Sequence, residues 1–132
     1  MQFINKPKFN MGMLFEQCND SYLENVNVDS EDSGLSFFSS RRNSVIAPKL
    51  VHRNGDAAVL FYQGSMDNEL IGGTASMKEG LFASGVLIYD MANRCTVSGF
   101  NAKGFQRCAD VRGYCRGVIL TDNTLTINYL RT

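Results

Sequence analysis

Five basic side chains lie between residues 94 and 116, with aromatic rings and only one acid, Asp110, among them. An arginine guanidinium binds phosphate or carboxylate through two hydrogen bonds, and an aromatic face stacks on a nucleic-acid base. The segment therefore predicts a loop that binds an anion: a nucleic acid, a nucleotide or an acidic protein. The alternative is a solvated loop whose aromatic rings fill the core. The candidate binding residues are Arg94, Lys103, Phe105, Arg107, Arg112, Tyr114 and Arg116.

The opposite charge gathers between residues 16 and 32, which hold six carboxylates and no lysine or arginine. Because the chain has zero net charge, this separation predicts a surface complementary to a basic partner, or a mimic of a phosphate backbone. Internal pairing with residues 94–116 is the alternative. The spacing of these acids is not that of an EF-hand loop, so we predict no metal site. The acidic residues are Glu16, Asp20, Glu24, Asp29, Glu31 and Asp32.

Side chains suited to catalysis are scarce. His52 is the only histidine, and its place beside an Asn-Gly turn predicts an exposed hairpin tip rather than a general base. The glycine-rich segment Gly72–Ser76 lacks the lysine of a phosphate-binding loop and is read as a bulge or a close backbone crossing. We therefore expect a protein without catalysis or cofactor. An enzyme that uses Cys108 or Cys115 as nucleophile is the alternative.

The four cysteines are Cys18, Cys95, Cys108 and Cys115. Their spacing is not that of a structural zinc site. The N-terminus shows no signal peptide, which predicts a cytoplasmic protein with reduced cysteines, some of them buried. In an oxidising compartment the best disulfide candidate is Cys108–Cys115.

Length and composition indicate one globular domain over residues 1–132. The chain is 44% hydrophobic and 20% charged, which excludes wholesale disorder, and no apolar run is long enough to span a membrane. Apolar residues at helical spacing predict a helix from Asn10 to about Asn25. A polar loop follows to Gly34, so residues 1–34 form an acidic helix and loop.

Short apolar runs separated by turn residues predict strands over the remainder, residues 35–132. Their close spacing favours an antiparallel sandwich or a partly closed barrel with the helix packed on it, and an α+β fold is the alternative. We detect no internal repeat, and residues 101–116 read as an irregular connection. The predicted strands are Leu35–Ser39, Val45–His52, Ala57–Gln63, Leu70–Ser76, Leu81–Tyr89, Cys95–Phe100, Gly117–Thr121 and Leu125–Leu130. The predicted core residues are Phe15, Phe37, Val45, Val59, Phe61, Leu81, Val86, Ile88, Val97, Ile119, Ile127 and Tyr129.

These patterns together favour a small non-catalytic binding protein that docks on a macromolecular partner through charged surfaces. An inhibitor or immunity-type protein of bacterial or phage kind fits the small size and divided charge, and a protein partner is expected first. The alternative is a nucleic-acid- or nucleotide-binding domain that works through residues 94–116, and a cysteine-dependent enzyme ranks third. The oligomeric state does not follow from the sequence.

Overall fold

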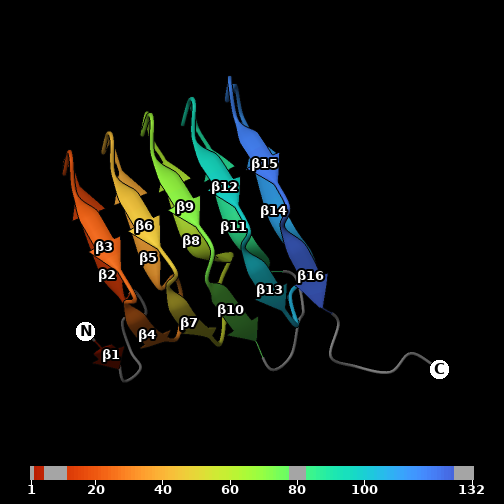
Figure 1. Cartoon of the computed structure of the whole chain (residues 1–132). Helices are drawn as coiled ribbons and strands as arrows, with labels where there is room; N and C mark the ends of the chain where they lie inside the picture. Colours follow the sequence, from red (N-terminus) through yellow and green to blue (C-terminus); the bar gives the residue numbers. More distant parts are fainter. Residues whose placement is uncertain (1, 5–11, 78–82, 127–132) are drawn as a thin grey trace.

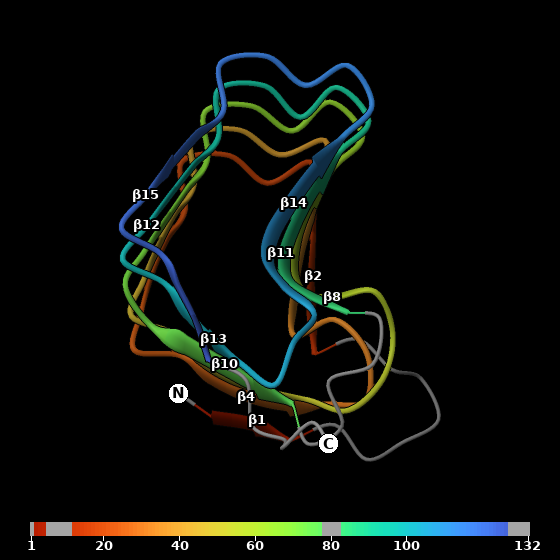
Figure 2. The same cartoon turned by 90° about the vertical axis from the view of Figure 1, so that its right-hand side faces the viewer.

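The computed structural model describes residues 2–4, 12–77 and 83–126, and within these ranges the chain is all β. Three parallel sheets wind around a common interior as a β-solenoid of about five turns (Figures 1 and 2). Each turn, here called a rung, adds one strand to every sheet. Equivalent positions of successive rungs are 22, 25, 27 and 23 residues apart.

Sheet 1 has six strands, and sheets 2 and 3 have five each. Sheet 1 contains β1 (Gln2–Ile4), β4 (Asn27–Ser30), β7 (Lys49–His52), β10 (Thr74–Met77), β13 (Asn101–Lys103) and β16 (Thr124–Thr126). Sheet 2 contains β2 (Met13–Glu16), β5 (Leu35–Phe38), β8 (Ala57–Tyr62), β11 (Ser84–Tyr89) and β14 (Arg107–Arg112). Sheet 3 contains β3 (Tyr22–Glu24), β6 (Ser44–Ile46), β9 (Glu69–Ile71), β12 (Thr96–Ser98) and β15 (Ile119–Thr121). Rung one is β2, β3 and β4, and rung five is β14, β15 and β16.

The interior is built from columns of side chains, because parallel in-register pairing places equivalent residues of successive rungs above one another, about 4.8 Å apart. In sheet 2 the column of Phe15, Phe37 and Phe61 has ring centroids 4.6 and 5.2 Å apart, with the rings stacked. Ile88 and Val111 continue this column into rungs four and five. Stacked rings of this kind hold neighbouring rungs in register as well as excluding water.

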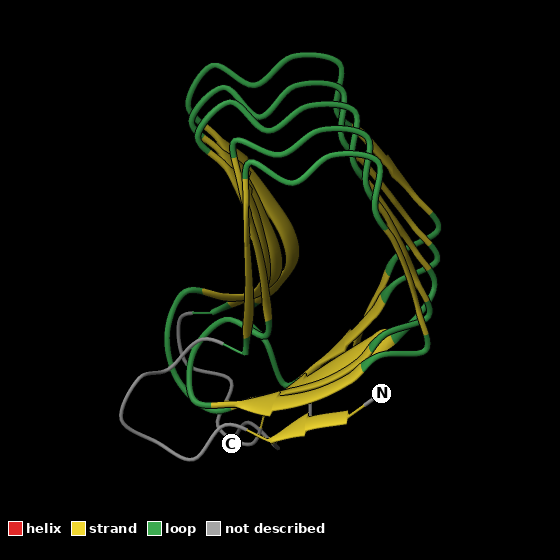
Figure 3. Cartoon of the chain, turned by 90° about the vertical axis from the view of Figure 1, so that its left-hand side faces the viewer, coloured by secondary structure: helices red, strands yellow, loops and turns green. Residues whose placement is uncertain are grey.

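The loops that join sheet 2 to sheet 3 have nearly the same path in every rung and form one edge of the solenoid (Figures 2 and 3). Buried polar side chains link each loop to the next. The Ser40 hydroxyl accepts a hydrogen bond from the Cys18 amide at 3.0 Å, and the Ser65 hydroxyl accepts one from the Ser40 amide at 3.1 Å. The Asn68 side-chain oxygen accepts a bond from the Asn43 amide at 3.0 Å. These bonds satisfy amides that no strand neighbour reaches.

Each of these loops also has a residue in the left-handed region at one equivalent position. Asp20, Arg42, Asp67 and Arg94 have φ between 53° and 59° there, and Gly117 follows in rung five. Glycine, asparagine and aspartate favour this conformation, whereas arginine pays a steric cost in it. Because arginine occupies this position in two of the five rungs, the repeated turn is not apparent from the sequence.

The predicted antiparallel sandwich or barrel is wrong, because every strand pair in the described residues is parallel. Close spacing between short strands is typical of hairpins. Here each gap instead carries the chain around a corner into the next sheet. The repeat was missed because its length varies and its corner positions hold unlike residues, as in the column Asn25, Ala47 and Gly72.

The predicted helix over residues 10–25 is also wrong. Residues 13–16 form β2, with Met13 and Phe15 packed against the core, whereas Leu14 is exposed. Positive φ angles at Gln17 and Asp20 are incompatible with a continuous helix. Apolar residues with period two over only four positions also fit part of a helical pattern, so the period was assigned wrongly. No described helix is long and apolar enough to cross a membrane.

Most predicted strands overlap real ones, but Val45–His52 and Leu70–Ser76 each span two strands that belong to different sheets. The polar loop expected to end at Gly34 contains β4, and residues 101–116, expected to be irregular, contain β13 and β14. Seven predicted core residues are buried: Phe37, Val45, Val59, Phe61, Val86, Ile88 and Val97. Phe15 packs against the core while partly exposed, and Ile119 is exposed. The predictions for Leu81, Ile127 and Tyr129 lie outside the described residues. Gly73 lies at a corner where a Cβ atom would clash with the Pro48 ring and backbone, so of the bulge and the close backbone crossing expected there the structure shows the close crossing.

Candidate functional site

The six predicted acidic residues all belong to rung one and lie on its outward side. We call them the acidic rim. Glu16 ends β2, Glu24 ends β3 and Asp29 lies in β4, so each of the three sheets contributes a carboxylate. Asp20 lies in the loop between sheets 2 and 3, and Glu31 and Asp32 follow β4. The rim therefore runs around the first end of the solenoid. Its residues are Glu16, Asp20, Glu24, Asp29, Glu31 and Asp32.

Two carboxylates of the acidic rim pair with arginines of rung two. Asp20 accepts two hydrogen bonds from Arg42, at 2.6 and 3.1 Å. Asp29 accepts two from Arg53, at 2.6 and 2.9 Å. The Arg42 guanidinium holds the pKa of the Asp20 carboxyl below its usual range through its hydrogen bond and its charge. Among the described residues, the other four carboxylates of the rim are in no ion pair.

The Asp20–Arg42 pair begins a column of alternating charge along the edge between sheets 2 and 3. Asp67 and Arg94 continue the column in rungs three and four, joined by hydrogen bonds of 2.8 and 3.1 Å. Arg94 lowers the pKa of Asp67 by hydrogen bonding and by charge, and Arg42 lowers it further by charge. In an in-register stack, like charges in one column would repel, so this alternation favours the observed register.

The predicted anion-binding residues are distributed around rungs four and five rather than gathered in one loop. Phe105 is buried in the core, Lys103 ends β13 and Arg107 begins β14. The remaining residues of the set lie together at the edge between sheets 2 and 3, where the Arg94 amide donates to the Arg116 carbonyl at 2.7 Å. These residues are Arg94, Arg112, Tyr114 and Arg116.

Two of these arginines already have carboxylate partners. Arg94 pairs with Asp67, and Arg112 lies 2.7 Å from Asp110. Tyr114, by contrast, is 90% exposed. The acidic rim and rung five lie at opposite ends of the stack (Figure 1). The sequence left open an internal pairing between the acidic residues and residues 94–116. Asp20 and Asp29 pair with arginines of rung two instead.

No family model, curated protein or solved structure matches this chain.

His52 does not lie at an exposed hairpin tip, as the sequence predicted. It ends β7, is 1% exposed, and its ring packs 5.7 Å from that of Phe105. Its Nδ1 lies 2.8 Å from the Asp32 carbonyl oxygen, and its Nε2 lies 3.3 Å from that of Gly55. The expected Asn-Gly hairpin is instead a corner between two parallel sheets. The imidazole joins β7 to that corner and is closed to a substrate.

The four cysteines are free thiols. Cys108 lies near the start of β14 and Cys115 lies beyond its end. An extended strand advances about 3.3 Å per residue, which places their Cα atoms too far apart for the predicted Cys108–Cys115 disulfide. Burial raises the pKa of the Cys95 thiol to about 11 and also raises the pKa values of Cys108 and Cys115. A nucleophilic cysteine needs a lowered pKa, so these directions weigh against a cysteine-dependent enzyme.

We expect Cys95 to resist alkylation until the chain unfolds, because its thiol is buried and only the thiolate reacts quickly. Iodoacetamide at pH 7.5, followed by peptide mass spectrometry, should label all four cysteines in 6 M urea and leave Cys95 unlabelled in native buffer. Rapid native labelling of Cys95, or of Cys108 or Cys115 faster than a free thiol, would contradict the raised pKa values.

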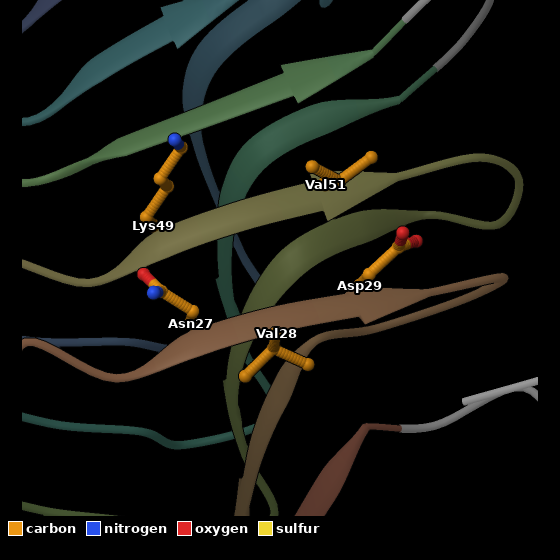
Figure 4. Close-up of a pocket in the computed structure, with 5 residues that line it drawn as sticks. All are labelled: Asn27, Val28, Asp29, Lys49 and Val51. Atoms are coloured by element: carbon orange, nitrogen blue, oxygen red, sulfur yellow. The ribbon is translucent and has the colours of Figure 1, made fainter. Parts of the chain in front are cut away.

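A small hollow lies on the described surface of sheet 1. Its volume is about 200 Å³, and it is lined by Asn27, Val28, Asp29, Lys49 and Val51 (Figure 4). Ligand pockets usually have volumes of about 300–1,000 Å³, so this hollow is small for a small-molecule site. Among the described residues, no three His, Cys, Asp or Glu side chains lie together as a metal site requires.

Exposed apolar side chains gather on the end rungs, a feature that sequence reasoning missed. On rung one, Leu14 and Tyr22 are 48% and 65% exposed. On rung five the exposed apolar residues are Val111, Tyr114, Ile119, Leu120 and Leu125. Period-two alternation would have placed Leu14 and Tyr22 outward, had β2 and β3 been recognised as strands.

Proposed function

We propose that this chain is a non-catalytic binding protein that docks a basic protein partner on its acidic rim. The observation that carries the proposal is the composition of rung one, where residues 12–34 contain six carboxylates and no lysine or arginine. Four of these carboxylates, Glu16, Glu24, Glu31 and Asp32, are in no ion pair among the described residues, and such an excess of negative charge speeds the encounter with a partner of opposite charge and orients it. The small hollow on sheet 1, the buried His52 and the raised thiol pKa values support a role without catalysis.

The neighbouring apolar residues support a protein as the partner. Leu14 lies in β2 beside Glu16, and Tyr22 lies in β3 beside Glu24, with each pair on the outer side of its sheet. Protein interfaces combine buried aromatic and aliphatic contacts with a charged margin. The Asp20–Arg42 and Asp29–Arg53 ion pairs join the rim to rung two but are exposed to water, so they contribute little to holding it in place.

The test is an affinity capture with matched variants of the tagged chain. We expect one protein, identified by mass spectrometry, to be captured by the wild type after nuclease treatment and to be released as salt rises. The variant Glu16→Lys/Glu24→Lys should lose it, because both changes reverse charge on the rim. Asp122→Lys reverses an exposed carboxylate on rung five and should retain it. Equal capture by the rim variant would contradict the proposal.

Nucleic-acid binding at Arg112, Tyr114 and Arg116 is the second candidate, favoured by the exposed Tyr114 ring, which has an arginine two residues before it and another two residues after it in the sequence. Nuclease-sensitive capture of nucleic acid that falls steeply with salt would support it. Arg112→Glu/Arg116→Glu should then abolish the capture, whereas the rim variant should retain it. That outcome would replace the acidic rim as the docking surface.

A further inference from the structure

Rung five exposes side chains that belong to the core by their register. Val111 continues the column of Ile88, Leu120 that of Val97, and Leu125 that of Ala102, and these three partners are buried. Val111, Leu120 and Leu125 nevertheless remain 39%, 45% and 37% exposed. In the described residues β14, β15 and β16 each have a single strand neighbour. Rung five thus presents both apolar side chains and unpaired strand edges, which favour association.

The first end of the solenoid does not fit onto this surface. β1 extends sheet 1 one strand beyond rung one, whereas sheets 2 and 3 stop at β2 and β3. A second copy that met β1 through its β16 would remain about 4.8 Å, one strand spacing, from β2 and β3. Stacking head to tail is therefore blocked, and stacking head to head would bring two acidic rims together. The remaining arrangement joins rung five to rung five.

We propose that two copies of this chain associate through rung five, tail to tail, about a two-fold axis that passes through sheet 2. Such an axis sets β14 antiparallel to β14 of the second copy, and β15 antiparallel to its β16. β15 and β16 have three residues each, so their lengths match in this pairing. Isologous contacts of this kind close at a dimer, because the only strand edges that the described residues leave outside the joint belong to the two acidic first ends, which repel one another. The three core-register side chains are then covered from both sides.

The charges of β14 fit this symmetry. Val111 faces inward, and its neighbours Asp110 and Arg112 both lie in outward columns, those of Leu87 and Tyr89. Within one chain Arg112 already lies 2.7 Å from Asp110. When Val111 lies on the axis, the two ion pairs face each other with Asp110 of each copy opposite Arg112 of the other, because antiparallel strands reverse the order of residues. Opposite charges in such cross-strand positions stabilise the pairing. The acidic rims point away from the joint, so the dimer presents two docking surfaces at once.

The experiment measures the mass of the full 132-residue chain by sedimentation velocity from 1 to 100 µM. We expect a shift to twice the 14.7 kDa of one chain. Arg112→Asp should raise the dimer dissociation constant about tenfold, because it puts carboxylates opposite one another. The exchanged variant Asp110→Arg/Arg112→Asp should restore it, since the cross-strand charges are again opposite. Arg41→Asp, an exposed change on rung two, is the matched control and should leave the constant unchanged.

A monomer at all concentrations would overturn the proposal. Growth beyond the dimer would indicate head-to-tail stacking and would overturn it as well. Failure of the exchanged variant to restore association, in a chain with the wild-type urea midpoint, would refute the Asp110–Arg112 pairing. Val111→Lys distinguishes a folding defect from loss of the dimer interface. Because the side chain at position 111 is partly exposed in the single chain, the variant should fold as a monomer but should not form the dimer. These readouts are independent of capture by the acidic rim, so each proposal stands or fails alone.

Discussion

Replacing Phe37 by alanine should lower the free energy of unfolding by about 3–5 kcal/mol, the usual loss for a buried phenylalanine. Phe37 is fully buried and stacks between Phe15 and Phe61, so its removal leaves a cavity between two rungs. The close parallel stacking of strands limits how far the neighbours can move to fill that space. Since a domain of this size is stable by about 5–15 kcal/mol, the variant should lose a large fraction of its stability.

The next residue, Phe38, provides the matched control. It lies on the outer side of sheet 2, is partly exposed and contacts Tyr62 edge to face at a centroid distance of 5.3 Å. Phe38→Ala should cost about 1–2 kcal/mol, because part of the ring is already in water. Urea denaturation followed by circular dichroism measures both changes. Equal losses at the two positions would contradict the assignment of inner and outer columns.

Much of the strand content follows from the sequence, but the topology does not. The runs that contain β8 and β11 are apolar on both faces, and both strands are central in sheet 2. β8 and β11 are each buried over five successive residues, and such runs also occur in strands of parallel sheets that are covered on both faces. Strands pair parallel or antiparallel according to the direction that the chain takes after each strand. That direction depends on the backbone angles at the corners. Corners with Arg42 or Ala47 at positive φ carry no glycine signal.

The acidic residues could be identified as a group from the sequence, whereas the basic residues could not. Residues 16–32 fall within one rung, so a cluster in sequence is also a cluster in space. Residues 94–116 span most of a rung, and the winding of the chain takes Lys103 away from Arg116. Ion pairs such as Asp29–Arg53 join residues one rung apart. They become predictable only when the period of the solenoid is known.

The same period explains why a polar residue in the interior should matter as much as an apolar one. Asn68 is 1% exposed, and its side-chain oxygen accepts hydrogen bonds from the Asn43 amide and from the Asn43 side chain, each at 3.0 Å. Its own amide group donates to the Ser40 carbonyl at 3.0 Å. One side chain thus connects two successive loops of the edge between sheets 2 and 3.

Asn68→Ala should destabilise the chain by about 2–4 kcal/mol, because it leaves the buried Asn43 amide without an acceptor and adds a small cavity. Asn93→Ala is the matched control. Asn93 also accepts a bond from a backbone amide one rung away, that of Arg116 at 2.9 Å, but it is partly exposed. Water can replace its oxygen, so the loss should be about 1 kcal/mol. Equal falls of the urea midpoint in the two variants would show that burial does not determine how much these hydrogen bonds stabilise the chain. A larger fall for Asn68→Ala would identify the buried pair Asn43 and Asn68 as a main determinant of the register between rungs.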